Sequence, residues 1–360
     1  MMAALLENLG VTDMMLVSGL SLAAAVIVGL SLVRFARPHP LLPSCGVKGR
    51  VAALYSFPVK SCAAIKLEEA SVGECGIQGD REWMIVRAPT AEGEPAQMLT
   101  ARDLPTMLLI QPSFALSGEL QLTVAAGETI TVSPPPVDRL VEVTVWRTTC
   151  TGVDQGKDVS KFLSAYFGCP DESLLLLRMP DHLSRPLAEC SKYQHAPAIQ
   201  DSSDRGGNAK FSDWAQFNVL STASLRWLNR KTSPVEYTPE HFRANIIVDT
   251  IHEAPFQEDS WDEFSIGRVR FQFLKLTGRC LVPTIDPWTG ERDKNMQPLK
   301  TLRKLRGGVY HFLPKTHPHH ENKEAFFAMG ARHFFEPGQT LRVGDEVEVL
   351  KTRDPRLGLI

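Results

Sequence analysis

The sequence predicts an α+β protein rich in β-strands, in which an N-terminal β-barrel-like domain packs on a second β-barrel domain and one membrane-spanning helix precedes both. Three observations lead to this prediction. A run of 20 residues, 14–33, carries no charge. Apolar and polar residues alternate in short segments within 47–150 and again within 245–350. Helical spacing of apolar residues is limited to Asp158–Phe167 and a segment that follows Ser221.

The overall composition narrows the class of protein. The chain has 360 residues, of which 43% are apolar and 22% charged, as expected for a globular protein. Its 39 basic and 41 acidic side chains give a net charge of −2. Binding to a nucleic-acid backbone requires an excess of basic residues. The charge balance therefore excludes a general nucleic-acid-binding protein.

The uncharged run Met14–Val33 predicts a transmembrane anchor, because 20 helical residues span about 30 Å, the thickness of the hydrocarbon core of a bilayer. A cleaved or buried segment is the alternative, but a signal peptide needs a basic start and the tail 1–13 carries only Glu7 and Asp13. The linker 34–46 is rich in proline. Basic residues lie only on the C-terminal side of the run, which predicts that the globular part faces the cytosol; they are Arg34, Arg37, Lys48 and Arg50.

The first globular domain is expected to cover 47–180. Strand patterns occur at Val51–Val59 and Glu82–Arg87, and a hairpin pattern runs from Leu120 to Val132. Alternation at Val141–Val145 adds another strand, and the helix Asp158–Phe167 ends before Gly168 and Pro170. Short strands of this kind indicate a mostly antiparallel sheet or barrel.

The second domain is expected to cover 181–353. Its first part, 181–214, is polar and predicts a loop over a site. A helix should follow Ser221, which can serve as its N-cap. Strands are predicted at Asn245–Val248, Gly267–Leu276 and Thr340–Leu350. Acidic residues within 258–263 predict a solvated turn, with a docking surface for a redox partner as the alternative.

Three basic residues stand at the ends of predicted strands. They are Lys60, Arg81 and Arg243, and Ser61 adds a hydroxyl beside the first. Cations and free backbone N–H groups at strand ends suit an anion such as a phosphate. The alternatives are a surface lysine, and an arginine that pairs with its neighbours Asp80 or Glu82.

The cysteine pattern favours a single functional thiol. Seven cysteines are spread along the chain without a C-x-x-C pair, which argues against a disulfide scaffold or a four-cysteine zinc site. Cys280 follows Gly278 and Arg279, and an adjacent guanidinium favours a thiolate that can attack a substrate or ligate a soft metal. A small buried residue at a strand end is the alternative.

These motifs, in this order, resemble the MOSC-domain family, and in particular its membrane-anchored eukaryotic branch of mitochondrial amidoxime reducing components. The resemblance runs from about Val47 to Leu350. It is carried by PVKS at 58–61, GDREW at 79–83, LTARD at 99–103, FRANIIV at 242–248, and GRCLVPTIDPWTG at 278–290. It implies the two domains named above, as a MOSC N-terminal β-barrel domain and a MOSC domain.

The resemblance also implies a cofactor and the residues that hold it. The family carries molybdenum on a pterin dithiolene (molybdopterin), with one protein cysteine as metal ligand, and Cys280 stands at the matching position. Arg279 would then adjust charge and hydrogen bonding around the metal. The remaining positions that match the cofactor-binding residues of the family are Lys60, Ser61, Arg81, Asp213, Arg243 and Asn245.

The activity that the resemblance implies is reduction of N-hydroxylated compounds, such as amidoximes and hydroxylamines, to the amine or amidine. No G-x-G-x-x-G motif for NADH or flavin follows a strand, so a partner must supply the electrons. The resemblance implies cytochrome b5 and its NADH-dependent reductase, at the mitochondrial outer membrane with the globule facing the cytosol. The endoplasmic reticulum is the alternative membrane, and a cofactor carrier or sulfur-transfer protein with Cys280 as persulfide carrier is the alternative function.

The chain departs from the family pattern at several positions. Hydroxyl residues common in animal members are replaced by Trp214 and Ala215, and an aromatic residue expected near the C-terminus is replaced around Arg332 and His333. We therefore expect cofactor binding to be kept and substrate preference to differ. Three histidines at 317–320 predict a solvated loop and not a metal site.

Overall fold

A computed structural model describes residues 46–187, 207–250, 254–307 and 325–353, apart from single residues at 92, 136, 138 and 147. The predicted tail 1–13 and membrane helix 14–33, most of the linker, and the histidine cluster at 317–320 lie outside these residues. Within the described ranges, no helix combines the length and apolar character needed to cross a membrane. All elements below belong to the compact unit Pro43–Ile360.

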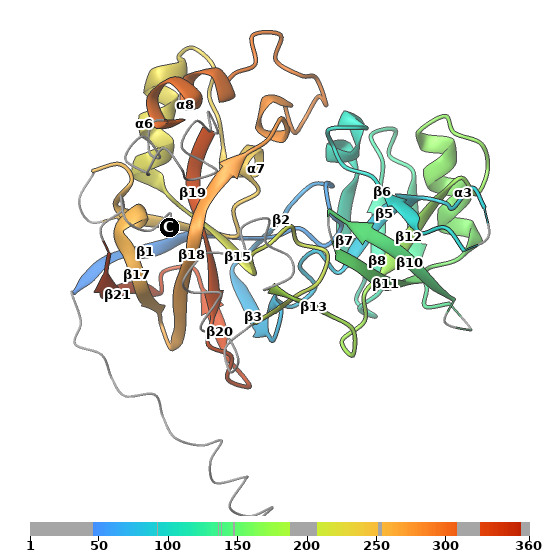
Figure 1. The fold of residues 1–360 in the computed structure, drawn as a ribbon, viewed down its shortest axis with the longest axis horizontal. Helices are drawn as coiled ribbons and strands as arrows, with labels where there is room; N and C mark the ends of the chain where they lie inside the picture. The colour runs from blue at the N-terminus through green and yellow to red at the C-terminus, as the bar shows by residue number, and fades with distance from the viewer. Residues whose placement is uncertain are drawn as a thin grey trace, which may run out of the picture. The chain divides into compact units, whose positions relative to one another are not determined.

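The C-terminal half is built on an eight-stranded sheet (Figure 1). Its strand order is β16-β15-β19-β18-β17-β21-β1-β2, and a further pairing between β16 and β1 closes seven of the strands into a barrel. The strands are β1 (Val47–Ser56), β2 (Ile65–Leu67), β15 (Phe217–Ser221), β16 (Ile246–Thr250), β17 (Trp261–Ile266), β18 (Val269–Arg279), β19 (Ala325–His333) and β21 (Glu346–Thr352).

The first strand of the globule pairs with this C-terminal sheet, although it lies in the segment 47–180 that the sequence predicts as the first domain. β1 pairs antiparallel with β16, with Val51 opposite Val248 and Leu54 opposite Ile246. It also pairs with β21 and, at its C-terminal end, with β2. Figure 1 shows β1, coloured blue, among the yellow and red C-terminal strands. Alternation within a strand reveals the buried face but not the partner, which is why the sequence pattern did not predict this pairing.

A second link joins the same two parts of the chain. β3 (Glu69–Gly73) pairs with both β4 (Gly76–Ile77) and β20 (Thr340–Arg342). The single strand predicted at Thr340–Leu350 is therefore two strands. Gly344, at φ 91°, turns the chain between β20 and β21, and the turn is held by the Asp345 carboxylate, which accepts the N–H of Arg342 at 2.8 Å.

The N-terminal half contains a closed barrel with the strand order β10-β11-β12-β5-β6. The predicted hairpin is confirmed beside it as β8 and β9, with Leu122 opposite Ile130. The strands are β5 (Trp83–Arg87), β6 (Ala96–Met98), β7 (Gln111–Phe114), β8 (Leu120–Thr123), β9 (Thr129–Val132), β10 (Leu140–Val145), β11 (Thr148–Asp154) and β12 (Leu174–Arg178). β13 (Arg185–Pro186) pairs with β14 (Asn208–Ala209) within the region predicted as a loop.

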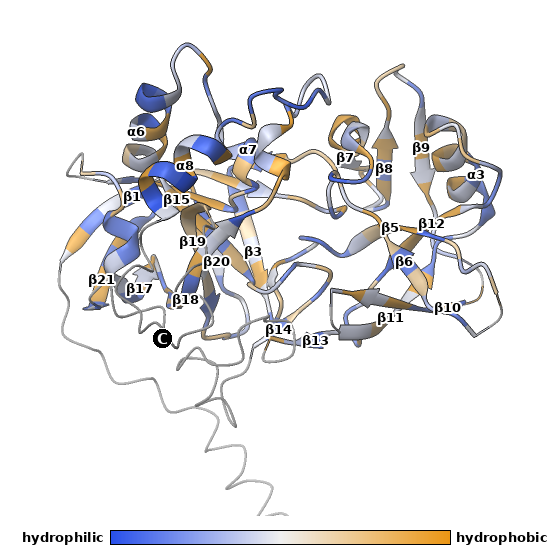
Figure 2. Ribbon diagram, turned by 45° about the horizontal axis from the view of Figure 1, so that its top comes forward, coloured by the Kyte–Doolittle hydropathy of each residue, from blue (hydrophilic) through white to orange (hydrophobic). Residues whose placement is uncertain are grey.

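Both predicted helices are present. α3 covers Lys157–Tyr166, and α6 covers Thr222–Thr232 with Ser221 as N-cap, whose hydroxyl accepts the N–H of Ser224 at 3.1 Å. Figure 2 shows hydrophilic residues along α6 and α8, which cover apolar strands. The other helical segments are α7 (Pro239–Phe242), α8 (Leu299–Arg306), and the 3-10 turns η2 (Pro105–Leu109), η3 (Gln257–Ser260) and η4 (Val282–Thr284).

Aromatic packing fills the C-terminal core. The rings of Phe264 and Phe271 stack 5.0 Å apart, and Phe217 meets Phe271 edge-on at 5.1 Å. The solvated turn predicted at 258–263 is wrong, because Glu258 and Asp259 are buried. Arg306 pairs with Asp259 at 2.5 Å, and this ion pair lets the carboxylate enter the core.

His333, one of the residues that depart from the family pattern, is buried as a neutral imidazole. Gln216 donates from Nε2 to the carbonyls of Glu74 and Asn208, so its Oε1 must face His333. His333 therefore donates from Nδ1 to that oxygen at 2.9 Å. Burial lowers the pKa of His333 to about 4.

This burial predicts a loss of stability in mild acid. The folded pKa lies below the ordinary value of about 6.5, so the unfolded chain binds the proton first as pH falls. The stability that the neutral His333 contributes is complete above pH 6.5 and is lost progressively as pH falls from 6.5 through 4. For this residue we expect the free energy of unfolding to fall by about 2 kcal/mol between pH 7 and pH 5, measured by urea denaturation.

Two variants separate the effect of His333 on the pH dependence of stability from the effects of other titrating groups. His333→Asn removes the imidazole, so its unfolding free energy should change less between pH 7 and pH 5 than that of the wild type. His182 is exposed, and His182→Asn should retain the wild-type profile. Equal pH profiles for His333→Asn and the wild type would contradict the assignment.

Candidate functional site

One cavity of about 640 Å³ contains all eight residues that the sequence singled out. Lys60 and Ser61 follow β1, Arg81 precedes β5, and Asp213 precedes β15. The other four come from the ends of α7 and β18 and from the start of β16. The structure thus brings together Lys60, Ser61, Arg81, Asp213, Arg243, Asn245, Arg279 and Cys280.

Three of these residues have a left-handed backbone that is uncommon for side chains larger than glycine. The φ angles are 69° for Ser61, 49° for Arg81 and 50° for Arg243. Backbone hydrogen bonds hold these turns, since Arg81 donates its N–H to the carbonyl of Phe57 at 2.9 Å. Such strain persists where surrounding structure enforces it, and it is common at functional sites.

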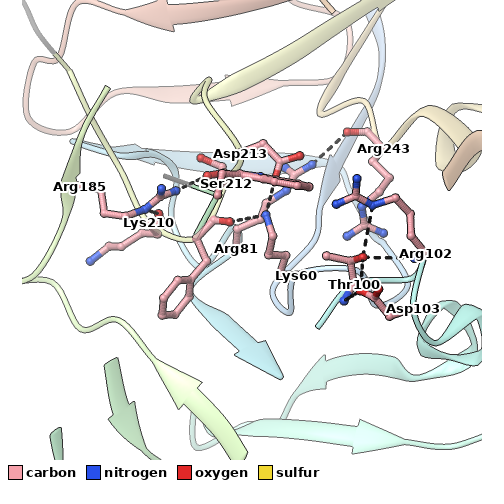
Figure 3. A network of polar contacts seen from close by, with 12 residues as sticks. Lys60, Arg81, Thr100, Arg102, Asp103, Arg185, Lys210, Ser212, Asp213 and Arg243 are labelled. Carbon is pink, nitrogen blue, oxygen red and sulfur yellow. Dashed lines mark hydrogen bonds and ion pairs between the residues drawn. The ribbon is translucent and has the colours of Figure 1, made fainter. Parts of the chain in front are cut away.

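Lys60 and Asp213 form an ion pair inside the cavity (Figure 3). The Lys60 ammonium is buried and also donates to the carbonyl of Phe211 at 2.8 Å. Burial lowers the pKa of Lys60, although Asp213 opposes this shift. Burial would raise the pKa of Asp213, but the charge and hydrogen bond of Lys60 outweigh it and hold that pKa well below its usual range. The carboxylate is thus ionised, and half of its side chain is exposed to the cavity.

Arg81 links the loop before β5 to the C-terminal sheet. It pairs with Asp80 at 2.5 Å, as the alternative interpretation of the sequence proposed. It also donates to Oδ1 of Asn245 at 3.0 Å and to the carbonyl of Arg243 at 3.0 Å. Asn245 in turn donates to the carbonyl of Tyr55 at 3.1 Å. One guanidinium therefore fixes residues from both parts of the chain at the cavity.

Arg243 has one nitrogen available for a ligand. Its Nη1 donates to the carbonyl of Cys62 at 2.6 Å, and its guanidinium lies 4.3 Å from the centre of the Phe57 ring. Its Nη2 is buried and makes no hydrogen bond to the described residues. Burial, together with the charge of Arg81, lowers the pKa of Arg243 to about 9. A buried donor without a partner is costly, so this nitrogen indicates a missing acceptor.

Arg279 uses its hydrogen-bond donors for contacts within the protein. It donates from Nε to the carbonyl of Phe327 at 2.7 Å and from Nη1 to the carbonyl of Phe242 at 2.9 Å. Its Nη2 reaches Oδ1 of Asn218 at 3.3 Å. Burial lowers the pKa of Arg279 to about 9, against the opposing effect of Cys280. Arg279 thus fixes the end of β18, from which the next residue enters the cavity.

Cys280 is exposed at the cavity, and the alternative of a small buried residue is wrong. Among the described cysteines it is the only one in the cavity lining. Cys62 lies nearby but is buried, which raises the pKa of its thiol to about 12. In the parts of the chain that the structure describes, no three His, Cys, Asp or Glu residues cluster as metal ligands.

The structure adds cavity residues that the sequence analysis did not assign. Thr100 and Arg102 belong to the LTARD motif, which carried the resemblance but was given no role. His241 immediately precedes the FRAN motif, and burial lowers its pKa to about 4. No motif in the sequence around Trp146 or Lys275 indicated that either residue lies at the site. The residues added to the lining include Thr100, Arg102, Trp146, Trp214, His241 and Lys275.

The residues present fit the molybdenum cofactor that the resemblance implied. Arg243 Nη2 and the buried hydroxyl of Ser212 are polar atoms without hydrogen bonds to described residues, and both residues line the cavity. Lys60, Arg81 and Arg243 supply positive charge for a phosphate. Cys280 supplies an exposed thiol, a preferred ligand type for soft metals.

Comparison with known proteins agrees with this site. Residues 48–170 match the MOSC N-terminal beta barrel domain and residues 206–348 match the MOSC domain. Mitochondrial amidoxime-reducing component 1 of Mus musculus is 31% identical over 342 residues, covering 91% of this chain and 89% of that protein.

Two further relatives differ in how much of their length is matched. Human mitochondrial amidoxime-reducing component 1 is 29% identical, covering 72% of each chain. Molybdenum cofactor sulfurase of Danio rerio is 30% identical over 72% of this chain, but the match covers only 31% of that protein. Both family models are matched in order along one chain, and they span most of the globule. The protein therefore belongs to the MOSC-domain family, which includes amidoxime-reducing components and molybdenum cofactor sulfurases.

Proposed function

We propose that this protein is a molybdenum-cofactor-dependent oxidoreductase that reduces N-hydroxylated compounds, such as amidoximes and hydroxylamines. The observation that carries the proposal is the exposed Cys280 thiol in a cavity lined by cations from both parts of the chain. The similarity to an amidoxime-reducing component along 91% of this chain supports it. The match to the molybdenum cofactor sulfurase of Danio rerio covers only 31% of that protein.

The protein's contribution is to hold the cofactor and to position the metal ligand. Lys60, Arg81 and Arg243 bind its phosphate, and Ser61 and Asn245 lie beside them. Cys280 ligates the metal. Molybdenum on a pterin dithiolene supplies the two-electron redox chemistry that the side chains lack. Because Arg279 is fixed by two backbone carbonyls, it keeps the segment that bears Cys280 in place.

The reaction also needs protons. Reducing an N–OH group to N–H takes two electrons and two protons and releases one water. His241 lines the cavity, and its Nδ1 accepts the N–H of Thr238 at 3.1 Å, so the neutral ring carries its proton on Nε2. These two protons come from solvent. With its pKa lowered to about 4 by burial, His241 is neutral at physiological pH, so its role would be to orient the N–OH oxygen by a hydrogen bond from Nε2 and not to supply the protons.

The electrons come from a partner. We propose cytochrome b5 and its NADH-dependent reductase as donors, and an N-terminal membrane anchor at 14–33 that places the globule on the cytosolic face of the mitochondrial outer membrane. Attachment to one membrane would raise the effective concentration of the three proteins. The sequence of 14–33 supports the anchor.

Turnover tests the proposal directly. The full chain, expressed in a host that makes molybdenum cofactor, should convert benzamidoxime to benzamidine when NADH, cytochrome b5 and the reductase are supplied. Cys280→Ala should lower kcat at least 100-fold, because a metal ligand is lost. Product formation is measured by chromatography.

The control variant is Cys169→Ser, which removes a thiol outside the cavity lining and should retain activity. Full activity of Cys280→Ala would overturn the proposal. An inactive wild type that instead passes sulfur from a Cys280 persulfide to an acceptor would establish the alternative, a sulfur-transfer or carrier function.

Cofactor retention is a second test that needs no turnover. Arg243→Gln removes a cation whose Nη2 atom is buried and makes no hydrogen bond to the described residues. Hydrogen bonds to charged groups contribute about 1.5–3 kcal/mol. We expect cofactor affinity to fall by roughly 10- to 100-fold, measured as molybdenum per protein after extensive dialysis.

Arg50→Gln is the matched control, since Arg50 forms an exposed ion pair with Glu346 outside the cavity. It should retain wild-type molybdenum. Unchanged metal content in Arg243→Gln would refute the role of Arg243 in binding the cofactor.

A further inference from the structure

We propose that the cavity selects planar N-hydroxylated substrates that carry a negative charge, such as an aromatic carboxylate, and that Arg102 and Lys275 provide this selectivity. The inference rests on the proposed function and names its substrate class. Two cation–aromatic pairs in the cavity lining carry it, Arg102 with Trp146 and Lys275 with Trp214. The residues that hold the cofactor are not among them.

The first pair is held firmly at the cavity. The guanidinium of Arg102 lies 4.3 Å from the centre of the Trp146 ring. Trp146 donates from Nε1 to the Asp213 carboxylate at 2.9 Å, which fixes the indole. Arg102 also donates to the hydroxyl of Thr100 at 3.4 Å. A cation stacked on an aromatic ring keeps N–H groups at its edge for a ligand.

The second pair is set by a glycine in the facing strand. The ammonium of Lys275 lies 4.1 Å from the centre of the Trp214 ring. A Cβ atom at Gly330 would lie 2.0 Å from the indole, so only glycine lets Trp214 pack against β19 at this point. Trp214 is one of the residues that depart from the family pattern. The departure therefore replaces hydroxyl groups by an aromatic wall with a cation over it.

The charges of the cavity favour an anion. Among the described residues that line it, Asp213 is the only carboxylate, and it is paired with Lys60. Lys60, Arg81 and Arg243 are assigned above to the cofactor phosphate, and Arg279 binds backbone carbonyls. Arg102 and Lys275 add two further positive charges to this lining, each placed over an indole ring. Walls of low dielectric concentrate such a field.

The substrate that fits combines both features. The ring of an aromatic amidoxime packs on the indoles, while a carboxylate on that ring accepts hydrogen bonds from Arg102 or Lys275. A neutral amidoxime uses only the apolar contacts. A cationic one meets repulsion, so the same residues also act against the wrong substrates.

The test compares 4-carboxybenzamidoxime with benzamidoxime. We expect the wild type to have the higher kcat/KM for the carboxylated compound, mainly through a lower KM. The ratio of the two kcat/KM values should fall about threefold in Arg102→Gln and in Lys275→Gln, and roughly tenfold in the double variant. Lys300→Gln, an exposed change on α8 outside the lining, should retain the wild-type ratio.

Binding gives a readout that does not depend on turnover. Without NADH, intrinsic tryptophan fluorescence reports ligand binding next to Trp146 and Trp214. The wild type should bind 4-carboxybenzamidoxime more tightly than benzamidoxime, and only the former should weaken markedly as salt is raised. The Arg102→Gln and Lys275→Gln variants should lose this difference in proportion to their kinetic ratios.

The outcomes separate the inference from the proposed function. Reduction of benzamidoxime without preference for the carboxylate would overturn the inference and leave the function standing. Anion-selective binding without any reduction would overturn the function and support the selectivity. Loss of molybdenum from Arg102→Gln would assign Arg102 to the cofactor and overturn its part in selectivity.

Discussion

The arrangement of the cavity depends on how one half-buried cation, Arg81, is neutralised by the buried Asp80 carboxylate. Its pairing with Asp80 satisfies the charge, and Asp80 in turn accepts the backbone N–H of Phe57 at 2.7 Å. The same guanidinium binds Asn245 and the carbonyl of Arg243. Removing either partner would leave a buried charge unpaired, which is far costlier than losing a surface pair. This network therefore determines where the cavity residues from both parts of the chain lie.

Local patterns in the sequence predicted local structure well. The hairpin around Leu122, the helix α3 and the Ser221 cap all depend on neighbouring residues, and all three are present. The partner of β1 and the burial of Asp259 depend on residues far away in the chain, so periodicity could not reveal them. Strand order is a property of the whole fold, and an ion pair that buries a carboxylate leaves no trace in local spacing.

The candidate site was predicted by motif order, since Lys60 and Cys280 stand 220 residues apart in sequence and yet line one cavity. What motifs could not supply were the contacts that make a side chain functional. Trp146 is held at the cavity by its hydrogen bond to Asp213, and Lys275 lies at the cavity over the ring of Trp214. Arg279 had been expected to act near the metal, whereas its donors hold backbone carbonyls.

The position of β1 also affects how the chain folds during its synthesis. The five barrel strands lie within 83–178 and can close as soon as that segment leaves the ribosome. β1 is made earlier but must wait for β16 and β21, since Tyr55 meets Asn245 across 190 residues. Until then only the C-terminal end of β1 is paired, with β2, and the rest of the strand keeps open edges, a known route to aggregation. Translation of the last third of the chain therefore sets how long the first strand of the globule stays open to wrong pairing.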